Sequence, residues 1–355
     1  MKTAARSIPR APAYPVQIDL DLSNRCNLFC RFCHFRYFKP KSADDFTYEK
    51  FLTLAPLLKH LKKVTLFSKF EPLVCRDFLK IYRAIAAYPD IELYFSTNGV
   101  LLNREIINAL VGRLKYLTVS ITGFTRENYL KNMGKDALPI VLKNLRLLKA
   151  AKKRAGTDLP VLRISTVGAL DTVQELSSAV NIAHQMDARE GVQVTSLIGY
   201  DDHLARLMPM KNPEYFLAHA RAAQAYAKKL GVKFVLQSGD FDENKKATGA
   251  IGHRQCDIPW QRLSIQPNGD TYPCPAAYKP IGNIFQTSAI TIWRGAKMRA
   301  FRRGVNDTRH MNYACKVCLH CRHKSISNST MNDLSNAPEY LTGMKRRKGV
   351  DGGKR

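Results

Sequence analysis

The chain has 355 residues, of which 45% are hydrophobic and 24% charged, and 56 Lys and Arg against 29 Asp and Glu give a net charge of +27. This composition excludes an intrinsically disordered chain, a collagen and a membrane-embedded bundle. The sequence has neither a signal-peptide h-region nor a run of about 18 apolar residues, so we expect a cytoplasmic protein without a membrane span. Its length is enough for about two domains.

Residues 16–236 alternate short apolar runs with longer amphipathic segments. The runs predict six strands, at 16–22, 64–67, 93–96, 116–121, 161–167 and 192–197. The segments between and after them predict helices at 48–61, 77–87, 105–111, 138–151, 172–185 and 213–230. Strands that alternate with helices form a parallel sheet, so the fold class is α/β. We expect a partial, TIM-like (β/α)6 barrel with its functional loops after the strands.

The pattern changes beyond Leu236. Residues 237–252 are polar and predict a linker, and 253–325 predict a small α+β cysteine-rich domain with a turn at 267–270. Residues 1–15 and 326–355 are predicted tails. The C-terminal tail contains the basic run 345–348 without interleaved aromatic residues, so we expect a solvated tail and not a nucleic-acid-binding arm.

Three of the nine cysteines follow the first predicted strand directly. Cys26, Cys30 and Cys33 are separated by three residues and then by two. In a reducing compartment such cysteines are metal ligands or catalytic thiols and not disulfides. Three thiolates on one loop can ligate three irons of a 4Fe-4S cluster and leave the fourth iron open. Zinc is the alternative, but His34 follows Cys33 immediately and is badly placed to complete a tetrahedron.

This loop resembles the CxxxCxΦC signature of the radical S-adenosylmethionine (SAM) enzymes, with Phe32 at the aromatic position. The resemblance implies that the open iron binds the amino and carboxylate groups of SAM. Reductive cleavage of SAM would then give a 5′-deoxyadenosyl radical that abstracts hydrogen from a substrate. It also implies reduced flavodoxin or ferredoxin as the electron donor.

Further positions are similar to SAM-binding elements of that family. The stretch 67–73 resembles the GGEP motif, although Lys69 and Phe70 replace its glycines, and 96–99 resembles the TNG element. The resemblance assigns SAM contacts to Phe32, Glu71, Ser96, Asn98, Ser120 and Lys131. Lys131 stands where relatives often carry an Arg for the SAM carboxylate. The alternative for the serine and asparagine positions is a capping or turn residue.

A second group of cysteines lies near the C-terminus, at Cys256, Cys274, Cys315, Cys318 and Cys321. With the motifs around 265–270 and 273–274, this region resembles the SPASM or twitch domain of a radical SAM subgroup. Full SPASM domains hold two auxiliary clusters with about seven or more cysteines, whereas five suffice for one auxiliary 4Fe-4S cluster. We expect Cys256, Cys274, Cys315 and Cys318 as ligands, with Cys321 competing for the last place. A saturated cluster would carry electrons. A structural zinc ribbon is the alternative.

Two further features lie after predicted strands. Cys75 is either a buried core residue or a thiol that returns a hydrogen atom to a substrate radical. Residues 199–203 supply polar groups at the rim of the barrel for substrate binding or proton transfer.

These observations favour an enzyme that acts on a small substrate, such as a sugar, cyclitol or nucleotide. Fifteen residues before the first strand are few for a leader-peptide domain, and the positive charge favours an anion. Peptide maturation is the alternative within the family. A non-catalytic, basic, metal-containing nucleic-acid-binding protein would leave the missing fourth ligand of the triad and the barrel-like repeat unexplained. Nucleic acid is therefore not the expected partner.

Overall fold

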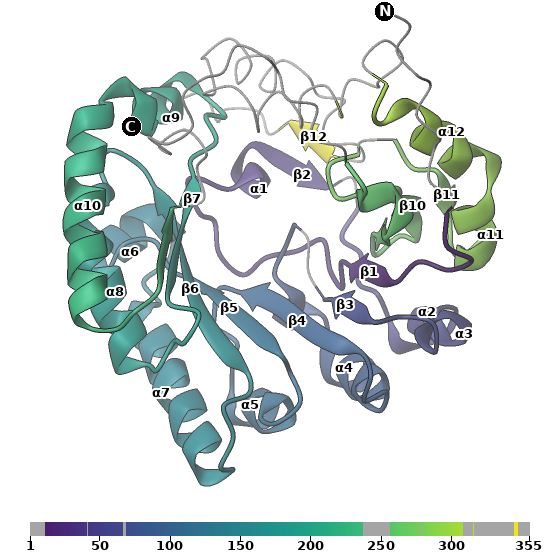
Figure 1. The fold of residues 1–355 in the computed structure, drawn as a ribbon, viewed down its shortest axis with the longest axis horizontal. Coiled ribbons are helices and arrows are strands. Elements are labelled where there is room, and N and C mark those ends of the chain that lie inside the picture. The colour runs from purple at the N-terminus through teal and green to yellow at the C-terminus, as the bar shows by residue number, and fades with distance from the viewer. Residues whose placement is uncertain are drawn as a thin grey trace, which may run out of the picture.

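A curved sheet with helices on its outer face organises the protein, seen in a computed structural model that describes residues 11–40, 42–66, 69–236, 256–277, 279–307, 315 and 344–346 (Figure 1). The barrel wall consists of parallel strands, in the order β1 (Gln17–Leu20), β3 (Lys63–Thr65), β4 (Glu92–Thr97), β5 (Tyr116–Ser120), β6 (Val161–Gly168), β7 (Val192–Ser196) and β8 (Phe234–Leu236). The predicted partial barrel and all six predicted strands are confirmed, and β8 is an additional strand.

The helices follow the strands as predicted. They are α2 (Tyr48–Leu52), α3 (Ala55–Leu58), α4 (Phe78–Ala86), α5 (Arg104–Leu110), α7 (Leu138–Arg154), α8 (Leu176–Gln185) and α10 (Pro213–Lys229). The single helix expected over 48–61 is divided into α2 and α3. The described helices that were not predicted include α6 (Arg126–Met133) and α9 (Asp202–Arg206). α6 has few apolar residues and thus weak periodicity, but Thr125 caps its first turn by accepting from the Asn128 N–H.

Side chains along each strand point alternately toward the hydrophobic core and toward the lumen of the partial barrel. In β4, Leu93, Phe95 and Thr97 are buried, and Phe95 packs edge-to-face on Phe78 of α4 at 5.3 Å between ring centroids. The residues between them, including Ser96, face the opposite side, which is the lumen of the partial barrel. The hydrophobic core therefore lies between sheet and helices, and polar side chains remain free to line the lumen.

The cysteine-rich region continues the same sheet. Its strands β9 (Arg262–Ile265), β10 (Asp270–Tyr272) and β11 (Gly282–Asn283) are ordered β11-β10-β9-β1, with β9 parallel to β1. The predicted turn between β9 and β10 is confirmed, with Gly269 at φ 86°. Two helices, α11 (Ala289–Arg294) and α12 (Ala296–Gly304), pack beside these strands at the edge of the molecule (Figure 1). The region therefore shares backbone hydrogen bonds with the barrel.

One part of the C-terminal tail forms a strand, which the sequence did not predict. β12 (Met344–Arg346) pairs antiparallel with β2 (Phe38–Pro40), which follows α1 (His34–Tyr37) directly. A sheet ladder uses backbone groups, so it can form without the apolar pattern on which strand prediction depends. The predicted linker, 237–252, lies outside the described residues.

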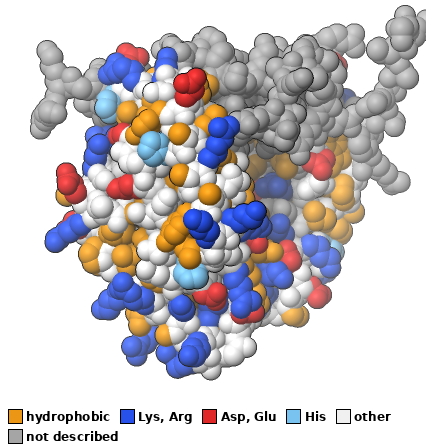
Figure 2. All heavy atoms as spheres, turned by 60° about the vertical axis from the view of Figure 1, so that its left-hand side comes forward, with side chains coloured by type: hydrophobic (Ala, Val, Ile, Leu, Met, Phe, Trp, Pro, Cys, Tyr) orange, Lys and Arg blue, Asp and Glu red, His pale blue; other side chains and the backbone are white. Residues whose placement is uncertain are grey.

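The outer wall of the described part of the chain carries many basic residues. Figure 2 shows Lys and Arg side chains most densely toward the lower part of one face, with acidic side chains among them. α7 carries basic residues and no acidic ones, and Lys152 to Arg154 form its last turn, which leads into the start of β6. This end of α7 lies at the amino ends of the strands, opposite their functional ends. Within the described ranges, no helix is long and apolar enough to cross a membrane.

Candidate functional site

The three clustered cysteines lie on the loop between β1 and α1, at the carboxyl end of the parallel strands. Cys26, Cys30 and Cys33 are free thiols. The backbone N–H groups of Leu28 and Phe35 donate to the sulfur atoms of Cys26 (3.5 Å) and Cys33 (3.4 Å). Donors of this kind stabilise the thiolate, which is the form of cysteine that binds iron.

The electrostatics of the loop fit an iron-sulfur cluster. Burial raises the pKa of Cys26 to about 12, and burial together with the nearby Cys33 and Cys26 raises the pKa of Cys30. Bound iron supplies the positive charge that three neighbouring thiolates require. No three His, Cys, Asp or Glu side chains in the described part of the chain converge on one ion position. Zinc needs such convergence, whereas the ligands of a cluster bind separate irons.

Several buried polar atoms around this loop have no hydrogen-bond partner. Among the described residues, Asn27 Nδ2 and Arg31 Nε are on the loop, and His34 Nε2 is on the first residue of α1. Two more, the Tyr129 hydroxyl and Asn132 Oδ1, are on α6. Because buried polar groups are almost always hydrogen-bonded, this concentration indicates a site for a further polar group. The cysteine donors and these atoms together fit a cluster with a polar ligand beside it.

α6 fixes the conformation of the cysteine loop. The N–H groups of Phe29 and Arg31 donate to the carbonyl oxygens of Met133 (3.3 Å) and Asn132 (3.0 Å). The helix then ends at Gly134, whose φ of 75° is left-handed. A Cβ atom at Gly134 would lie 2.5 Å from the Phe29 carbonyl oxygen. Glycine thus permits both the helix end and the close approach of the loop.

We expect Gly134→Ala to destabilise the loop and to lower the iron content of the reconstituted protein. A non-glycine residue at this φ costs about 1–3 kcal/mol, and the contact with Phe29 adds to that cost. Gly156→Ala is a matched control, because Gly156 also has a positive φ, 61°, but open space around its Cβ position. Urea denaturation and iron analysis compare the two variants. Equal iron content and equal stability would contradict the proposed contact.

Glu71 connects the loops that follow β3 and β4. Its carboxylate is 3% exposed and accepts hydrogen bonds from the Asn98 N–H (2.7 Å) and the Thr97 hydroxyl (2.7 Å). Burial raises its pKa to about 7, although these hydrogen bonds oppose the shift. The Asn98 amide donates to Asn27 Oδ1 (2.7 Å) and lies 3.9 Å from the Cys26 sulfur. Glu71 and Asn98 thus support the cysteine loop, and their direct contact with SAM stays a prediction.

The residues that replace the glycines of the GGEP motif extend to different sides. Phe70 packs edge-on against the His34 ring, at 5.2 Å between centroids. The ammonium of Lys69 lies 5.8 Å from the centroid of Tyr272 in β10, and the Lys69 N–H donates to Asp21 (3.1 Å). Lys69 therefore links this barrel loop to the auxiliary strands, a contact that glycine could not make.

The predicted serines share the lumen face. The register of the sheet pairs Ser96 with Thr118 and Ser120 with Ser165. Residues two positions apart in a strand point to the same side, so Ser96 and Ser120 lie on one face of adjacent strands. The structure therefore brings them together near the carboxyl end of the sheet.

Lys131 and Phe32 are connected through Asp171 and Arg31, an ion pair that the sequence did not predict. Lys131 Nζ lies 3.3 Å from Asp171, with 55% of its side chain exposed. Arg31 also pairs with Asp171, at 2.7 Å, and its guanidinium lies 4.3 Å from the centre of the Phe32 ring. Arg31 is thus a second cation at this position. Its partner is 140 residues away in the chain, so the pattern gave no signal for the pair.

Cys75 lies in the hydrophobic core. It is 3% exposed, its thiol donates to the Phe46 carbonyl oxygen (3.5 Å), and burial raises its pKa to about 12. This position matches the alternative of a core residue and gives no support to hydrogen-atom transfer, which stays untested.

The structure brings two of the auxiliary cysteines together. Cys256 and the buried Cys315 belong to one hydrophobic cluster with Trp260. Asn306 holds Cys256 by accepting from its N–H (2.8 Å) and donating to its carbonyl oxygen (3.0 Å). Cys274 follows β10 on a separate loop, near Lys69. Cys318 and Cys321 lie outside the described residues, so their places as ligands stay predictions.

Comparison with known families decides the kind of chemistry. The family model of the radical SAM superfamily matches residues 20–175, the region that carries the cysteine loop. A model of an iron-sulfur cluster-binding domain, SPASM, matches residues 256–322. The chain is a radical SAM enzyme with a C-terminal SPASM domain. Membership in this family implies a 4Fe-4S cluster and SAM, and the SPASM domain implies auxiliary iron-sulfur binding, as predicted.

Relatives of this radical SAM enzyme differ in how much of it they match. A PqqA peptide cyclase from Bradyrhizobium diazoefficiens is 24% identical over 88% of this chain and 81% of its own. A probable GTP 3′,8-cyclase from Methanocella arvoryzae is 31% identical, but the match spans 32% of this chain and 36% of that protein. The crystal structure of SuiB from Streptococcus suis bound to SAM covers 93% of this chain and 76% of SuiB, with a TM-score of 0.63 and 16% identity. The last comparison supports the fold.

Proposed function

We propose that this radical SAM enzyme modifies a peptide. The observation that carries the proposal is the extent of the match to the PqqA peptide cyclase, which spans 88% of the chain and so is too long to be confined to the barrel. Matches to probable GTP 3′,8-cyclases span 32% and 63% of the chain. Peptide modification therefore takes precedence over the small anionic substrate that the sequence alone favoured.

The sheet topology supports an extended substrate. The ten-stranded sheet runs from β11 to β8 without these two edges pairing with each other. Among the described residues, the barrel wall is thus an unclosed sheet, and an unclosed sheet can admit a longer chain than a closed barrel can. The lumen face beside the cysteine loop carries Ser96 and Ser120, which offer hydrogen bonds to SAM or to a peptide backbone.

Part of the positive charge lies away from the site. The acid-free helix α7 places its last basic turn at the amino ends of the strands, away from the cysteine loop. Charges separated from a site by much more than a Debye length of about 8 Å contribute little to ligand binding there. The basic turn of α7 therefore contributes little to binding at the site, where the cations Arg31 and Lys131 are both paired with Asp171.

Each group of residues has a role in this proposal. Cys26, Cys30 and Cys33 hold the cluster, which when bound supplies the electron that cleaves SAM. The SAM site is formed or supported by Phe32, Glu71, Ser96, Asn98, Ser120 and Lys131. One auxiliary cluster is held by Cys256, Cys274, Cys315 and Cys318, and Cys321 is the competing ligand for the last place. Reduced flavodoxin or ferredoxin donates the electron, in the cytoplasm, where thiols stay reduced.

The proposal can be tested with anaerobically reconstituted enzyme, SAM and dithionite. The mixture is incubated in parallel with deuterated synthetic peptides and with deuterated GTP. The peptides are those encoded by short reading frames beside the gene. We expect deuterium to pass from one peptide into 5′-deoxyadenosine, with a peptide product of lower mass. Transfer from GTP and from none of the peptides would contradict the proposal. Mass spectrometry of both products gives the readout.

A further inference from the structure

Tyr129 has a buried hydroxyl without a hydrogen-bond partner. Its side chain on α6 is 0% exposed, and the hydroxyl makes no hydrogen bond within the described residues. The hydroxyl of a buried tyrosine normally finds a partner. An unpaired buried donor is unfavourable, so the Tyr129 hydroxyl is available to donate to a bound group if one lies near it.

The position of Tyr129 on α6 directs it to the cysteine loop. Tyr129 and Met133 are four residues apart and lie on the same face of the helix. The Met133 sulfur lies 3.8 Å from the Cys30 sulfur, and the Met133 carbonyl accepts from the Phe29 N–H. The face of α6 that contacts the loop is therefore the face that carries Tyr129.

The charged neighbours of the phenol are all at this site. Burial and then the negative charges of Cys30, Glu71 and Cys26 raise the pKa of Tyr129. The Glu71 carboxylate already accepts from the Asn98 N–H and the Thr97 hydroxyl. Cys30 and Cys26 are predicted cluster ligands, and sulfur bound to iron accepts hydrogen bonds. The cluster is thus the acceptor that the surroundings favour.

We propose that the Tyr129 hydroxyl donates a hydrogen bond to sulfur at the Cys30 edge of the SAM-binding cluster and raises the reduction potential of that cluster. Reduction adds negative charge to the cluster, so a donor stabilises the reduced state more than the oxidised one. Tyr129 is in this sense a positioning residue for electron uptake. The inference rests on ligation of the cluster by the Cys26, Cys30 and Cys33 loop.

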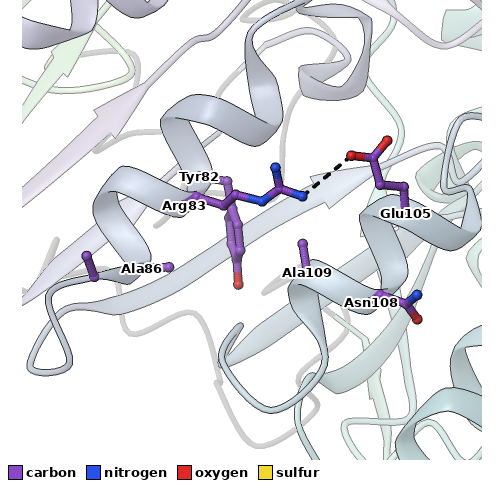
Figure 3. Close-up of a pocket in the computed structure, with 7 residues that line it drawn as sticks. Tyr82, Arg83, Ala86, Glu105, Asn108 and Ala109 are labelled. Carbon is purple, nitrogen blue, oxygen red and sulfur yellow. Dashed lines mark hydrogen bonds and ion pairs between the residues drawn. The ribbon is translucent and has the colours of Figure 1, made fainter.

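Tyr82 provides a matched control. It is 1% exposed, and its hydroxyl also lacks a partner within the described ranges. Figure 3 shows its ring between α4 and α5, beside the ion pair of Arg83 and Glu105. Burial raises its pKa, but the charged group near it is Arg113 and no cysteine. Removal of this hydroxyl changes a buried phenol in the same way without approaching the cysteine loop.

The experiment is a redox titration of the holoenzyme, followed by electron paramagnetic resonance, with Tyr129→Phe and Tyr82→Phe. The signal that changes when SAM is added identifies the SAM-binding cluster. We expect Tyr129→Phe to keep its iron but to lower the ratio of reduced to oxidised cluster about tenfold at a fixed potential, or about 59 mV for a one-electron couple. Tyr82→Phe should match the wild type. An unchanged potential in an iron-replete Tyr129→Phe variant would overturn the proposal.

A second variant keeps the proposal testable if Tyr129→Phe loses its cluster. A fluorinated tyrosine at position 129 keeps the shape of the side chain and is a stronger hydrogen-bond donor, so it should raise the potential. An unchanged or lower potential would refute the inference independently of the first variant. If the wild type itself has no SAM-responsive cluster, the ligation proposal fails instead, and the two failures are distinguishable.

Discussion

Replacement of Cys26, Cys30 and Cys33 together by Ala is expected to halve the iron content and to abolish SAM cleavage. The wild type should bind about eight irons, four for each cluster, and the variant about four. The three thiols occupy one loop whose N–H groups donate to Cys26 and Cys33, and alanine supplies no iron ligand in their place. With SAM and a strong reductant, the wild type should release 5′-deoxyadenosine even without substrate, and the variant should release none.

The control for this variant is Cys75→Ala. Cys75 is a buried thiol whose hydrogen bond goes to a core carbonyl, so its loss should leave both iron content and SAM cleavage unchanged. Iron and sulfide analysis and chromatography of 5′-deoxyadenosine give the readouts. SAM cleavage that survives in the triple variant would refute the role of the loop. Stoichiometric zinc without iron in the wild type would refute both cluster assignments.

Replacement of Cys256 and Cys274 by Ala should separate SAM cleavage from product formation. We expect the iron content to fall to about four, SAM cleavage to persist and turnover of the true substrate to fail. If four cysteines saturate the auxiliary cluster, it can accept or donate an electron but has no open iron for substrate. The two thiols flank β9 and β10, whereas the SAM-binding loop follows β1.

Ser264→Ala tests whether the loss of turnover comes from weaker pairing between β9 and β1 and not from loss of the auxiliary cluster. Ser264 lies on β9 and donates to Asp19 of β1 at 3.3 Å, so its loss weakens the same seam without removing a cysteine. This variant should keep both clusters and turnover. Full turnover in the double cysteine variant would contradict the electron-transfer role. A new nitrogen, oxygen or sulfur ligand on the auxiliary cluster upon substrate addition would show an open iron and a wrong ligand count.

The auxiliary region illustrates the limit of sequence reasoning on architecture. The turn at 267–270 and the cysteine-rich character were predictable, because Asn and Gly at these positions favour a specific turn. The parallel pairing of β9 with β1 was not, since Gln17 and Arg262 are far apart in sequence and register depends on backbone contacts between them. Tertiary structure, and not residue pattern, makes the two regions one sheet.

Local signals by themselves determined the strand-helix order, the cysteine spacing and the kind of cofactor. Apolar periodicity reports on strands, and ligand spacing on one loop reports on a cluster, because both depend on near neighbours in the chain. The structure decided which side chains meet across the fold: Arg31 with Asp171, Lys69 with Tyr272, and Met133 with Cys30. It also placed the basic turn of α7 away from the site. These contacts join distant segments, and no pattern of neighbouring residues encodes their distances.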